Sequence, residues 1–260
     1  MPELPEVDIL RRSLARKIIN SKIIFFDVFD KKILRGNKEL FQKKIKNSYF
    51  KYIKRYGGIL IFKLASGYYL LINLYSKGDL IYTKEKIKDK NIKAVFKFKN
   101  NSEVYFVNSG QFGYIQIIND KQRQRMSIHF GLDPTREEFT LGTLKKIFRN
   151  KSTNIKNLLM NKNLLSGIGT IYADEICLAA RVKPDRSVKF LKQSEVKRIY
   201  VAIRKIFKKS ILHGGIKGWY NKFICVHDRE GKKCLKCKQG IVKKILVSNR
   251  RTFFCPICQK

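Results

Sequence analysis

Apolar side chains recur at every third or fourth position over residues 2–19, a spacing that predicts a helix at the start of the chain. A helix with one apolar stripe has to bury that stripe against another element. Its apolar face would consist of Val7, Leu10, Leu14 and Ile18.

Over residues 21–118 the pattern changes to short apolar runs, which are typical of strands. Turn-forming residues at 65–67 and 100–102 separate neighbouring runs. Seven or eight short strands predict a β-sandwich or barrel, with the first helix packed against its edge or end. The expected strands are 22–28, 59–64, 68–74, 79–82, 94–99, 103–107 and 114–118.

Helical spacing returns after a linker-like stretch at 130–138, so the chain is predicted to be an α+β protein. Gly167 and Gly169 come just before residue 170, where we expect a helix to begin. Backbone N–H groups at such a place can approach a phosphate closely, although a plain tight turn is the commoner reason for glycines there. The expected helices are 141–149, 154–160, 170–180 and 193–212.

The charge of the chain narrows the possible partners. With 260 residues the chain fits one or two domains with a real core. Its formal net charge is +37, which predicts attraction to a polyanion and favours a nucleic acid. An acidic membrane surface is a second possibility, and a genome rich in A and T would also enrich lysine and isoleucine.

No apolar run reaches the ~18 residues that a transmembrane helix needs. Charged residues at the amino terminus argue against a signal peptide. We therefore expect an intracellular, reducing compartment, where six cysteines indicate metal binding rather than disulfides.

The cysteines near the carboxy terminus have the spacing of a metal site. Two Cys-x2-Cys pairs are separated by seventeen residues, with strand-like runs at 241–247 and 252–254 between them. This pattern predicts a β-hairpin held by one zinc ion, and four thiolates would leave no open position for catalysis. Cys177 and Cys225 lack a paired spacing and are expected to be buried apolar residues. The four expected ligands are Cys234, Cys237, Cys255 and Cys258.

The first six residues carry candidate covalent chemistry. If Met1 is removed, Pro2 presents a free secondary amine with the Glu3 carboxylate directly after it. An α-amino group titrates near pH ~7.7–8.0, so part of it is uncharged at neutral pH and can attack an aldehyde-like carbon. Alone, however, Pro2 and Pro5 could simply start a helix, since proline suits a first turn.

Three separated blocks together resemble the formamidopyrimidine-DNA glycosylases, which share a superfamily with endonuclease VIII. The blocks are 2–7 (Pro-Glu-Leu-Pro-Glu-Val), 155–175 with its Gly-Ile-Gly-Thr turn, and 229–231 leading into the four cysteines. The resemblance implies a catalytic β-sandwich domain at 1–132 and a helix–two-turn–helix DNA-binding domain at 133–225. The zinc hairpin would follow at 226–260.

The resemblance also implies removal of oxidised bases from duplex DNA and then strand cleavage. Pro2 would attack C1′ and form a Schiff base, Glu3 would move protons, and Arg250 would assist the second elimination and grip phosphate. A monomer without a nucleotide cofactor is expected. The further pocket or DNA-binding residues would be Glu6, Asn91, Phe112, Lys151, Lys156, Gly167, Gly169, Thr170 and Tyr172. Of these, Phe112 corresponds to an aromatic wedge, and Thr170 could still cap its helix.

The chain departs from the family pattern at several positions. Gly58 occupies the place of a phosphate-contacting lysine, for which Lys54, Arg55 or Lys77 could substitute. Two of the three side chains that fill the gap left by the extruded base are replaced, by Ser76 and Gly110. Tyr75 or Gln111, each next to a replaced position, could compensate.

Several functional alternatives follow from these departures. The segment 216–225 is about half as long as in the formamidopyrimidine branch, where it caps 8-oxoguanine, so an endonuclease VIII-like preference for oxidised pyrimidines or over-oxidised purines is open. The losses also fit an enzyme limited to abasic sites, or a DNA-binding protein without turnover. An RNA- or ribosome-binding module would explain the hairpin but not the first six residues.

Overall fold

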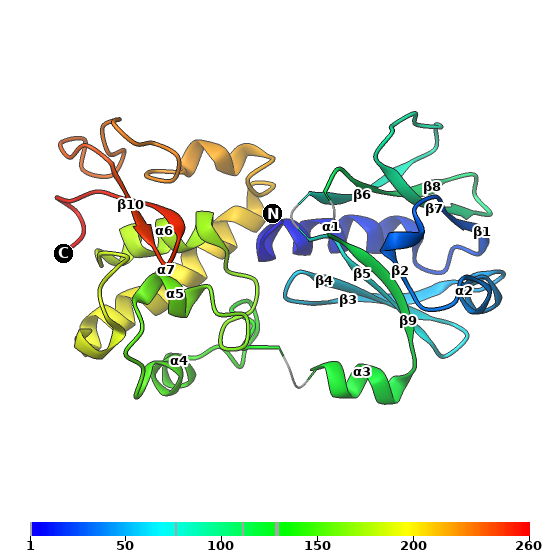
Figure 1. Ribbon diagram of the computed structural model, residues 1–260, viewed down its shortest axis with the longest axis horizontal. Coiled ribbons are helices and arrows are strands. Elements are labelled where there is room, and N and C mark those ends of the chain that lie inside the picture. The colour runs from blue at the N-terminus through cyan, green and yellow to red at the C-terminus, as the bar shows by residue number, and fades with distance from the viewer. Residues whose placement is uncertain (1, 76, 111, 128–129) are drawn as a thin grey trace. The chain divides into compact units, whose positions relative to one another are not determined.

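The computed structural model describes residues 2–75, 77–110, 112–127 and 130–260, and the chain forms two compact units within them (Figure 1). The amino-terminal unit contains Pro2 and the chain from Val7 to the gap at 128–129. The carboxy-terminal unit contains residues 3–6 together with 130–260. The first turn of the first helix therefore belongs with the second half of the chain.

Two sheets form the amino-terminal unit, which confirms the predicted β-sandwich (Figure 1). Among the described strands, neighbours are antiparallel except for the parallel pair of β2 and β9. The four-stranded sheet has, in spatial order, β1 (Ile23–Val28), β7 (Ile92–Phe98), β8 (Glu103–Asn108) and β6 (Gly78–Thr83). The five-stranded sheet has β2 (Leu34–Arg35), β9 (Tyr114–Ile118), β5 (Tyr69–Asn73), β4 (Ile59–Leu64) and β3 (Phe50–Tyr56).

Helix α1 (Leu4–Ile18) supplies part of the sandwich core. Val7, Leu14 and Ile18 are at most 1 % exposed and belong to one apolar cluster with Phe96 of β7 and Phe62 of β4. The helix was expected to pack against the edge or end of the sandwich, but it is buried more deeply than that. Its apolar stripe is part of the core that both sheets share.

Several elements of this unit were not anticipated from the sequence. In β3 a buried arginine, Arg55, interrupts the apolar alternation, and α2 is short and rich in lysine. Asn37 begins α2 by accepting the backbone N–H groups of Glu39 and Leu40. Besides the strands β2 and β3, the unanticipated elements are η1 (Lys31–Ile33), α2 (Lys38–Ile45) and α3 (Asp120–Ser127).

The carboxy-terminal unit is helical as far as Phe223, as expected. Its α6 is buried on almost every side, because Tyr172, Ile176 and Cys177 are all 0 % exposed. The bounds of α6 and α7 are those that the apolar spacing predicts. The helical elements are α4 (Leu141–Phe148), α5 (Ile155–Leu159), α6 (Thr170–Ala180), η2 (Val188–Phe190), α7 (Gln193–Leu212) and η3 (Trp219–Phe223).

The chain ends in a β-hairpin of β10 (Lys243–Val247) and β11 (Arg250–Phe254). Val247 and Arg250 face each other across a two-residue turn. Ser248 and Asn249 in this turn have φ values of 48° and 60°, which suit the right-handed twist of a tight hairpin. Within the described ranges, no helix combines the length and apolar character that a membrane crossing needs.

Candidate active site and nucleic-acid interface

Glu3 caps the amino-terminal end of α6. Its carboxylate accepts the backbone N–H of Gly169 at 2.6 Å and that of Ile171 at 3.1 Å. The first N–H groups of a helix have no partner within the helix, so a carboxylate at this end is stabilised. Thr170 was expected to cap α6, but the cap position is Gly169 and Glu3 supplies the acceptor oxygens instead.

The Glu3 carboxyl has an unusual acidity for a glutamate. It is only 3 % exposed, and burial, with a smaller contribution from the Glu6 charge, raises its pKa to about 8. The N–H groups of Gly169 and Ile171 act in the opposite direction because they stabilise the charged form. Near neutral pH the group therefore carries a proton that it can donate.

The glycine turn before α6 makes room for the amino-terminal peptide. Leu4 donates its backbone N–H to the carbonyl of Gly167 at 2.8 Å. A Cβ on Gly167, whose φ is +79°, would lie 2.5 Å from Leu4 Cβ. A Cβ on Gly169 would lie 2.5 Å from the Glu3 carboxyl carbon. The two glycines thus permit the approach of residues 3–4, and the N–H of Gly169 is used by Glu3 rather than left for a phosphate.

Glu6 fixes the position of Glu3. Its carboxylate accepts the backbone N–H of Glu3 at 3.0 Å, the Tyr172 hydroxyl at 2.6 Å and the backbone N–H of Ile216 at 3.0 Å. The Tyr172 hydroxyl also pairs with the Ser210 hydroxyl. This chain of contacts orients the peptide that joins Pro2 to Glu3.

This arrangement corrects one predicted site residue and adds two that were not predicted. Tyr172 was expected to line the pocket or contact DNA, but its side chain is 0 % exposed and acts on Glu6 instead. Ser210 and Ile216 were not identified from the sequence. They lie 38 and 210 residues from their partners, and no local motif marks such contacts.

The short segment after α7 packs closely onto α6. Tyr220 is 2 % exposed, and its ring centroid lies 5.8 Å from that of Tyr172. Its backbone N–H donates to the carbonyl of His213. The Gly215 φ of +68° brings the backbone close to Glu6, since a Cβ there would lie 2.7 Å from the Glu6 carboxylate.

Lys156 was expected to contact DNA, and the structure places it elsewhere. Its side chain is 0 % exposed and its Nζ lies 2.7 Å from the Asp174 carboxylate. The ammonium also donates to the Arg251 carbonyl at 2.9 Å and to the Thr252 hydroxyl at 2.8 Å. Lys156 therefore fastens the hairpin strand β11 to helix α6.

A second buried carboxylate of α6 holds the segment that leads into the cysteines. Glu175 accepts the backbone N–H groups of Cys225, Val226 and His227 at 2.9–3.1 Å. Burial raises the pKa of Glu175, and the three N–H groups partly offset this. The role of this carboxylate was missed, although two adjacent acids in an otherwise apolar helix were a visible signal.

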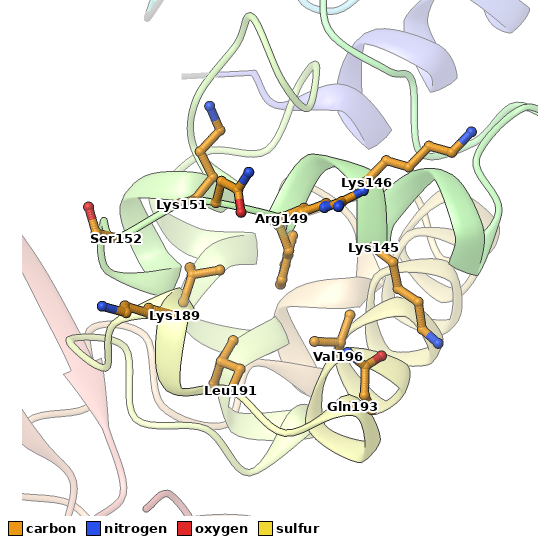
Figure 2. A pocket seen from close by; sticks show the side chains of 12 residues that line it. Lys145, Lys146, Arg149, Lys151, Ser152, Lys189, Leu191, Gln193 and Val196 are labelled. Atoms are coloured by element: carbon orange, nitrogen blue, oxygen red, sulfur yellow. The ribbon is translucent and has the colours of Figure 1, made fainter.

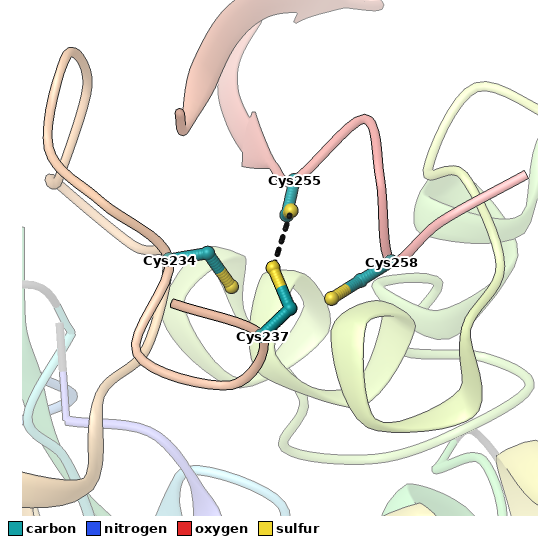
Figure 3. A group of neighbouring side chains, drawn as sticks. All are labelled: Cys234, Cys237, Cys255 and Cys258. Atoms are coloured by element: carbon teal, nitrogen blue, oxygen red, sulfur yellow. Dashed lines mark hydrogen bonds between the residues drawn. The ribbon is translucent and has the colours of Figure 1, made fainter. Parts of the chain in front are cut away.

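The four predicted cysteines come together in the structure (Figure 3). Their sulfur atoms all lie within 4.8 Å of one another, and those of Cys237 and Cys255 are 3.7 Å apart. The Gly240 N–H donates to Cys237 Sγ at 3.3 Å, and with the Gln239 amide it lowers the pKa of the Cys237 thiol to about 6. A Cβ on Gly240 would lie 2.5 Å from Cys255 Sγ. This donor set fits one tetrahedrally coordinated metal ion.

The remaining two cysteines lie outside this cluster. Cys177 is 0 % exposed, as expected, and burial raises the pKa of its thiol. Cys225 is only half-buried, and its Sγ contacts the carbonyl of Phe223.

Arg250 is exposed at the first position of β11, directly after the hairpin turn. The turn is tied to α5 because the Asn157 side-chain amide donates to the Ser248 hydroxyl. Together with the contacts of Lys156 to β11, this presents Arg250 at the surface on a fixed support.

A cavity of about 790 Å³ next to α4 and η2 gathers positive charge (Figure 2). Among the twelve residues that line it, no side chain is acidic. Phe148, Val188 and Leu191 give it apolar walls. Lys151, which was predicted to contact DNA, is exposed at its rim. The cationic residues of the cavity are Lys145, Lys146, Arg149, Lys151 and Lys189.

In the amino-terminal unit, Phe112 is 61 % exposed and lies against Tyr75. Asn91 is half-buried, and its side-chain amide donates to Asp89 at 2.9 Å. Gly58 has open space where a Cβ would be. Ser76 and Gln111, which the sequence analysis singled out, lie outside the described residues.

The three proposed substitutes for the missing lysine differ in exposure. Arg55 is 5 % exposed, lies 3.6 Å from Asp8 and donates to the carbonyl of Gly57, so it is held inside the unit. Lys54 and Lys77 are exposed and stay candidates.

A proline–glutamate terminus, a capped helix and a cysteine hairpin define a class of DNA-repair glycosylases that bind DNA, and comparisons with known proteins agree. Residues 1–115 match the family model for the formamidopyrimidine-DNA glycosylase N-terminal domain, and residues 130–219 match the model for its H2TH domain. The chain belongs to the formamidopyrimidine-DNA glycosylase family.

Individual relatives extend over the whole chain. The formamidopyrimidine-DNA glycosylase of Pelotomaculum thermopropionicum is 33 % identical over 275 residues, covering 100 % of this chain and 99 % of that protein. That of the Wolbachia of Brugia malayi is 31 % identical, with full coverage of both.

Solved structures of the Lactococcus lactis enzyme have the same fold. Its non-covalent complex with abasic-site DNA gives a TM-score of 0.92 at 28 % identity and covers 99 % of each chain. Its complex with a Fapy-dG-containing DNA gives a TM-score of 0.92 at 28 % identity and covers 99 % of this chain and 100 % of that one.

Proposed function

We propose that this protein is a bifunctional DNA glycosylase and abasic-site lyase that removes oxidised bases from duplex DNA. The observation that carries the proposal is the Glu3 carboxyl, which follows Pro2 directly, is buried on the end of α6 and has its pKa raised to about 8. A protonated acid next to a terminal amine is the pair that glycosidic bond cleavage by Schiff-base formation requires.

The proposed reaction begins once Met1 has been removed, because an acylated proline nitrogen has no lone pair to donate. The Pro2 nitrogen attacks C1′, and the bond between C1′ and the damaged base breaks with its electron pair leaving on the base. The attacked nitrogen loses its N–H proton and the departing base gains one, so the nitrogen regains its lone pair. Glu3 then gives its proton to the sugar-ring oxygen O4′. The ring opens as the nitrogen lone pair forms the C1′=N⁺ iminium ion.

Strand cleavage follows from the positive charge of the iminium ion. It acidifies C2′–H, and loss of that proton expels the 3′ phosphate by β-elimination. Water then hydrolyses the iminium and releases the enzyme. A free amine requires a pH above about 8 and a protonated Glu3 a pH below about 8, so the activity is expected to peak near there.

Zinc is proposed as the metal of the four-cysteine cluster. Cys234, Cys237, Cys255 and Cys258 would hold it, and four sulfur ligands give it a structural role only. Its contribution would be to fix the hairpin that carries Arg250. On this hairpin Arg250 would contact a DNA phosphate near the site of elimination.

Duplex DNA is the proposed partner, with the protein acting as a monomer in the bacterial cytoplasm and without a nucleotide cofactor. The net charge of +37 and the cationic cavity around Lys151 support binding to phosphates. The domain limits given above, including a separate hairpin domain at 226–260, remain predictions. The short segment at 216–225 weakens the case for 8-oxoguanine specificity and favours a more open pocket for oxidised pyrimidines or for ring-opened and over-oxidised purines.

Borohydride trapping on an oligonucleotide with an abasic site tests the proposal. Protein with Pro2 at its terminus should form a covalent adduct, and protein that retains Met1 should not. Pro2→Gly should reduce the adduct strongly. An equal adduct from the Met1-retaining protein would contradict the role of Pro2.

A second candidate function is binding of distorted DNA without turnover, which the glycines at positions 58 and 110 favour. It predicts tight, salt-sensitive binding to an abasic analogue and no strand cleavage. Cleavage that Glu3→Gln abolishes would exclude it. Gly58→Lys adds a cation in open space, and under the first proposal it should raise abasic-site turnover severalfold.

A further inference from the structure

Two aromatic rings stand together on the surface of the amino-terminal unit. Phe112 is 61 % exposed and Tyr75 is 43 % exposed. Their centroids lie 5.2 Å apart with an angle of 47° between the planes, so each ring covers part of the other. Exposed apolar side chains that gather into a patch on a strongly charged protein mark a surface for binding.

The backbone beneath these rings is strained. Tyr75 has a φ of +51°, a conformation that glycine adopts readily and other residues rarely. Its backbone N–H donates to the Asn73 side chain at 3.0 Å, directly after strand β5. Strain of this kind persists where the surrounding structure enforces it, and it concentrates at functional sites.

The partner ring has its own support. Asn108, at the end of β8, is 1 % exposed. Its side chain accepts the Gly110 N–H at 2.7 Å and donates to the Phe112 carbonyl at 2.8 Å. A buried amide thus sets the loop on which Phe112 is exposed, so both rings are placed by the fold.

Phe112 lies where the family has its aromatic wedge. We propose that Tyr75 adds a second ring to this wedge and enters the base stack beside the extruded nucleotide together with Phe112. The inference rests on the proposed function, which requires the damaged base to leave the stack and a gap to be filled. Apolar wedges unstack neighbouring bases, and aromatic rings stack on every base because each base has a π-face.

A wedge made of rings has a consequence for specificity. Stacking depends little on which base is present, whereas hydrogen bonds to base edges discriminate strongly. The contribution of Tyr75 should therefore be similar opposite adenine, cytosine, guanine and thymine.

Variants of Tyr75 test the wedge. Tyr75→Gly removes the ring and relieves the backbone strain, so its thermal midpoint should not fall. Its affinity for a duplex with a tetrahydrofuran abasic analogue should drop about tenfold, with little change on undamaged duplex. Phe112→Ala should behave alike, and Tyr75→Phe, which keeps the ring, should stay within about twofold of the parent.

A fluorescent base locates the effect. With 2-aminopurine opposite the analogue, the parent and Tyr75→Phe should change its emission on binding, and Tyr75→Gly should change it much less. Full affinity and an unchanged signal in Tyr75→Gly would overturn the wedge. So would oligomerisation of the DNA-free parent that Tyr75→Gly abolishes, because the patch would then bind a second copy.

A separate measurement distinguishes failure of the wedge from failure of the proposed function. Borohydride trapping on a single-stranded abasic oligonucleotide needs the Pro2 amine but no gap filling. If all variants trap equally on single strands and only the duplex responses differ, the wedge is supported. Absence of trapping in the parent would contradict the proposed function itself.

Discussion

Helix α6 holds two other segments of the chain, the amino-terminal peptide at its first turn and the cysteine hairpin at its next turn. Its first turn binds Glu3 through backbone N–H groups, and the carboxyl is left protonated near neutral pH. In the next turn of the helix, Asp174 is matched by Lys156, while Glu175 accepts three backbone N–H groups. One attachment holds the amino-terminal peptide and the other holds the cysteine hairpin.

The difference shows how one helix can position a proposed proton donor at one place and stabilise the fold at another. On the hairpin side, Asp174 is paired with the Lys156 ammonium, which suits a permanent support. Glu175 resembles Glu3 in that it accepts backbone N–H groups and burial raises its pKa, but it holds the hairpin segment and lies away from Pro2 in the sequence. On the amino-terminal side, burial keeps the Glu3 carboxyl away from its preferred charge state, which suits proton transfer. Changes on the hairpin side should therefore mainly cost stability, and changes on the amino-terminal side should mainly cost activity.

The largest effect is expected from loss of the metal. A strong chelator, or Cys255→Ser, should unfold the hairpin, because metal binding supplies about 10 kcal/mol or more of folding free energy in comparable small sites. Cys225→Ser, outside the cluster, is the matched control and should retain the metal. Zinc content and DNA affinity would be measured together, and unchanged DNA affinity in protein that has lost its zinc would contradict the structural role.

Removal of the buried ammonium should come next. Lys156→Met keeps the length of the side chain but leaves Asp174 buried without its cation, which costs about 3–5 kcal/mol. Lys151→Met, at an exposed lysine, should change the free energy of unfolding by less than about 0.5 kcal/mol. Chemical denaturation measures both. An equal effect of the two substitutions would show that Lys156 acts as an ordinary surface lysine.

The sequence predicted those elements that depend on interactions between residues close together in the chain. Helices α6 and α7 follow their apolar spacing, and the cysteine cluster follows its two short pairs. Strand β3 was missed because Arg55 occupies one of its buried positions, beside Asp8 of α1. A buried charged residue can be predicted from the sequence only when its distant partner is known.

The same limit applies to the site. Pro2 and Glu3 are adjacent, so the first six residues were enough to name them as a candidate amine and acid, and the family resemblance was needed to prefer this over a plain helix start. The cap that Glu3 places on α6 joins residues 166 positions apart, and no spacing rule describes it. Lys156 was placed among the pocket or DNA-binding residues because its partner, Asp174, lies 18 residues later and no local pattern links the two.

Glu3 should make stability depend on pH. Its pKa is about 8 in the folded protein against about 4.5 when exposed, so between these values the folded state holds a proton that the unfolded state releases. This contribution to stability is fully present below pH 4.5 and is lost as pH rises, and the loss reaches about 3 kcal/mol at pH 7. Glu3→Gln cannot ionise and should lack the slope.

The difference between the unfolding free energies of the parent and of Glu3→Gln, taken from pH 5 to pH 8, isolates this group from all others. Glu230→Gln, at an exposed position, is the matched control and should show no such trend. A parent that gains stability relative to Glu3→Gln as pH rises would mean that the folded-state pKa is lowered, and the proton-donor role would fail with it.

The smallest effect should separate positioning from packing. Tyr172→Phe keeps the ring against Phe207 and Tyr220 but leaves Glu6 and Ser210 without their shared hydroxyl, at a cost of about 1–3 kcal/mol. Because Glu6 holds the Glu3 amide, single-turnover cleavage at an abasic site should slow severalfold while DNA affinity stays constant. Tyr200→Phe, whose hydroxyl accepts a long hydrogen bond of 3.4 Å from Arg204 at the surface, is the control and should change neither. If cleavage slowed only in proportion to a loss of DNA affinity, Tyr172 would contribute to DNA binding and not to the positioning of Glu3.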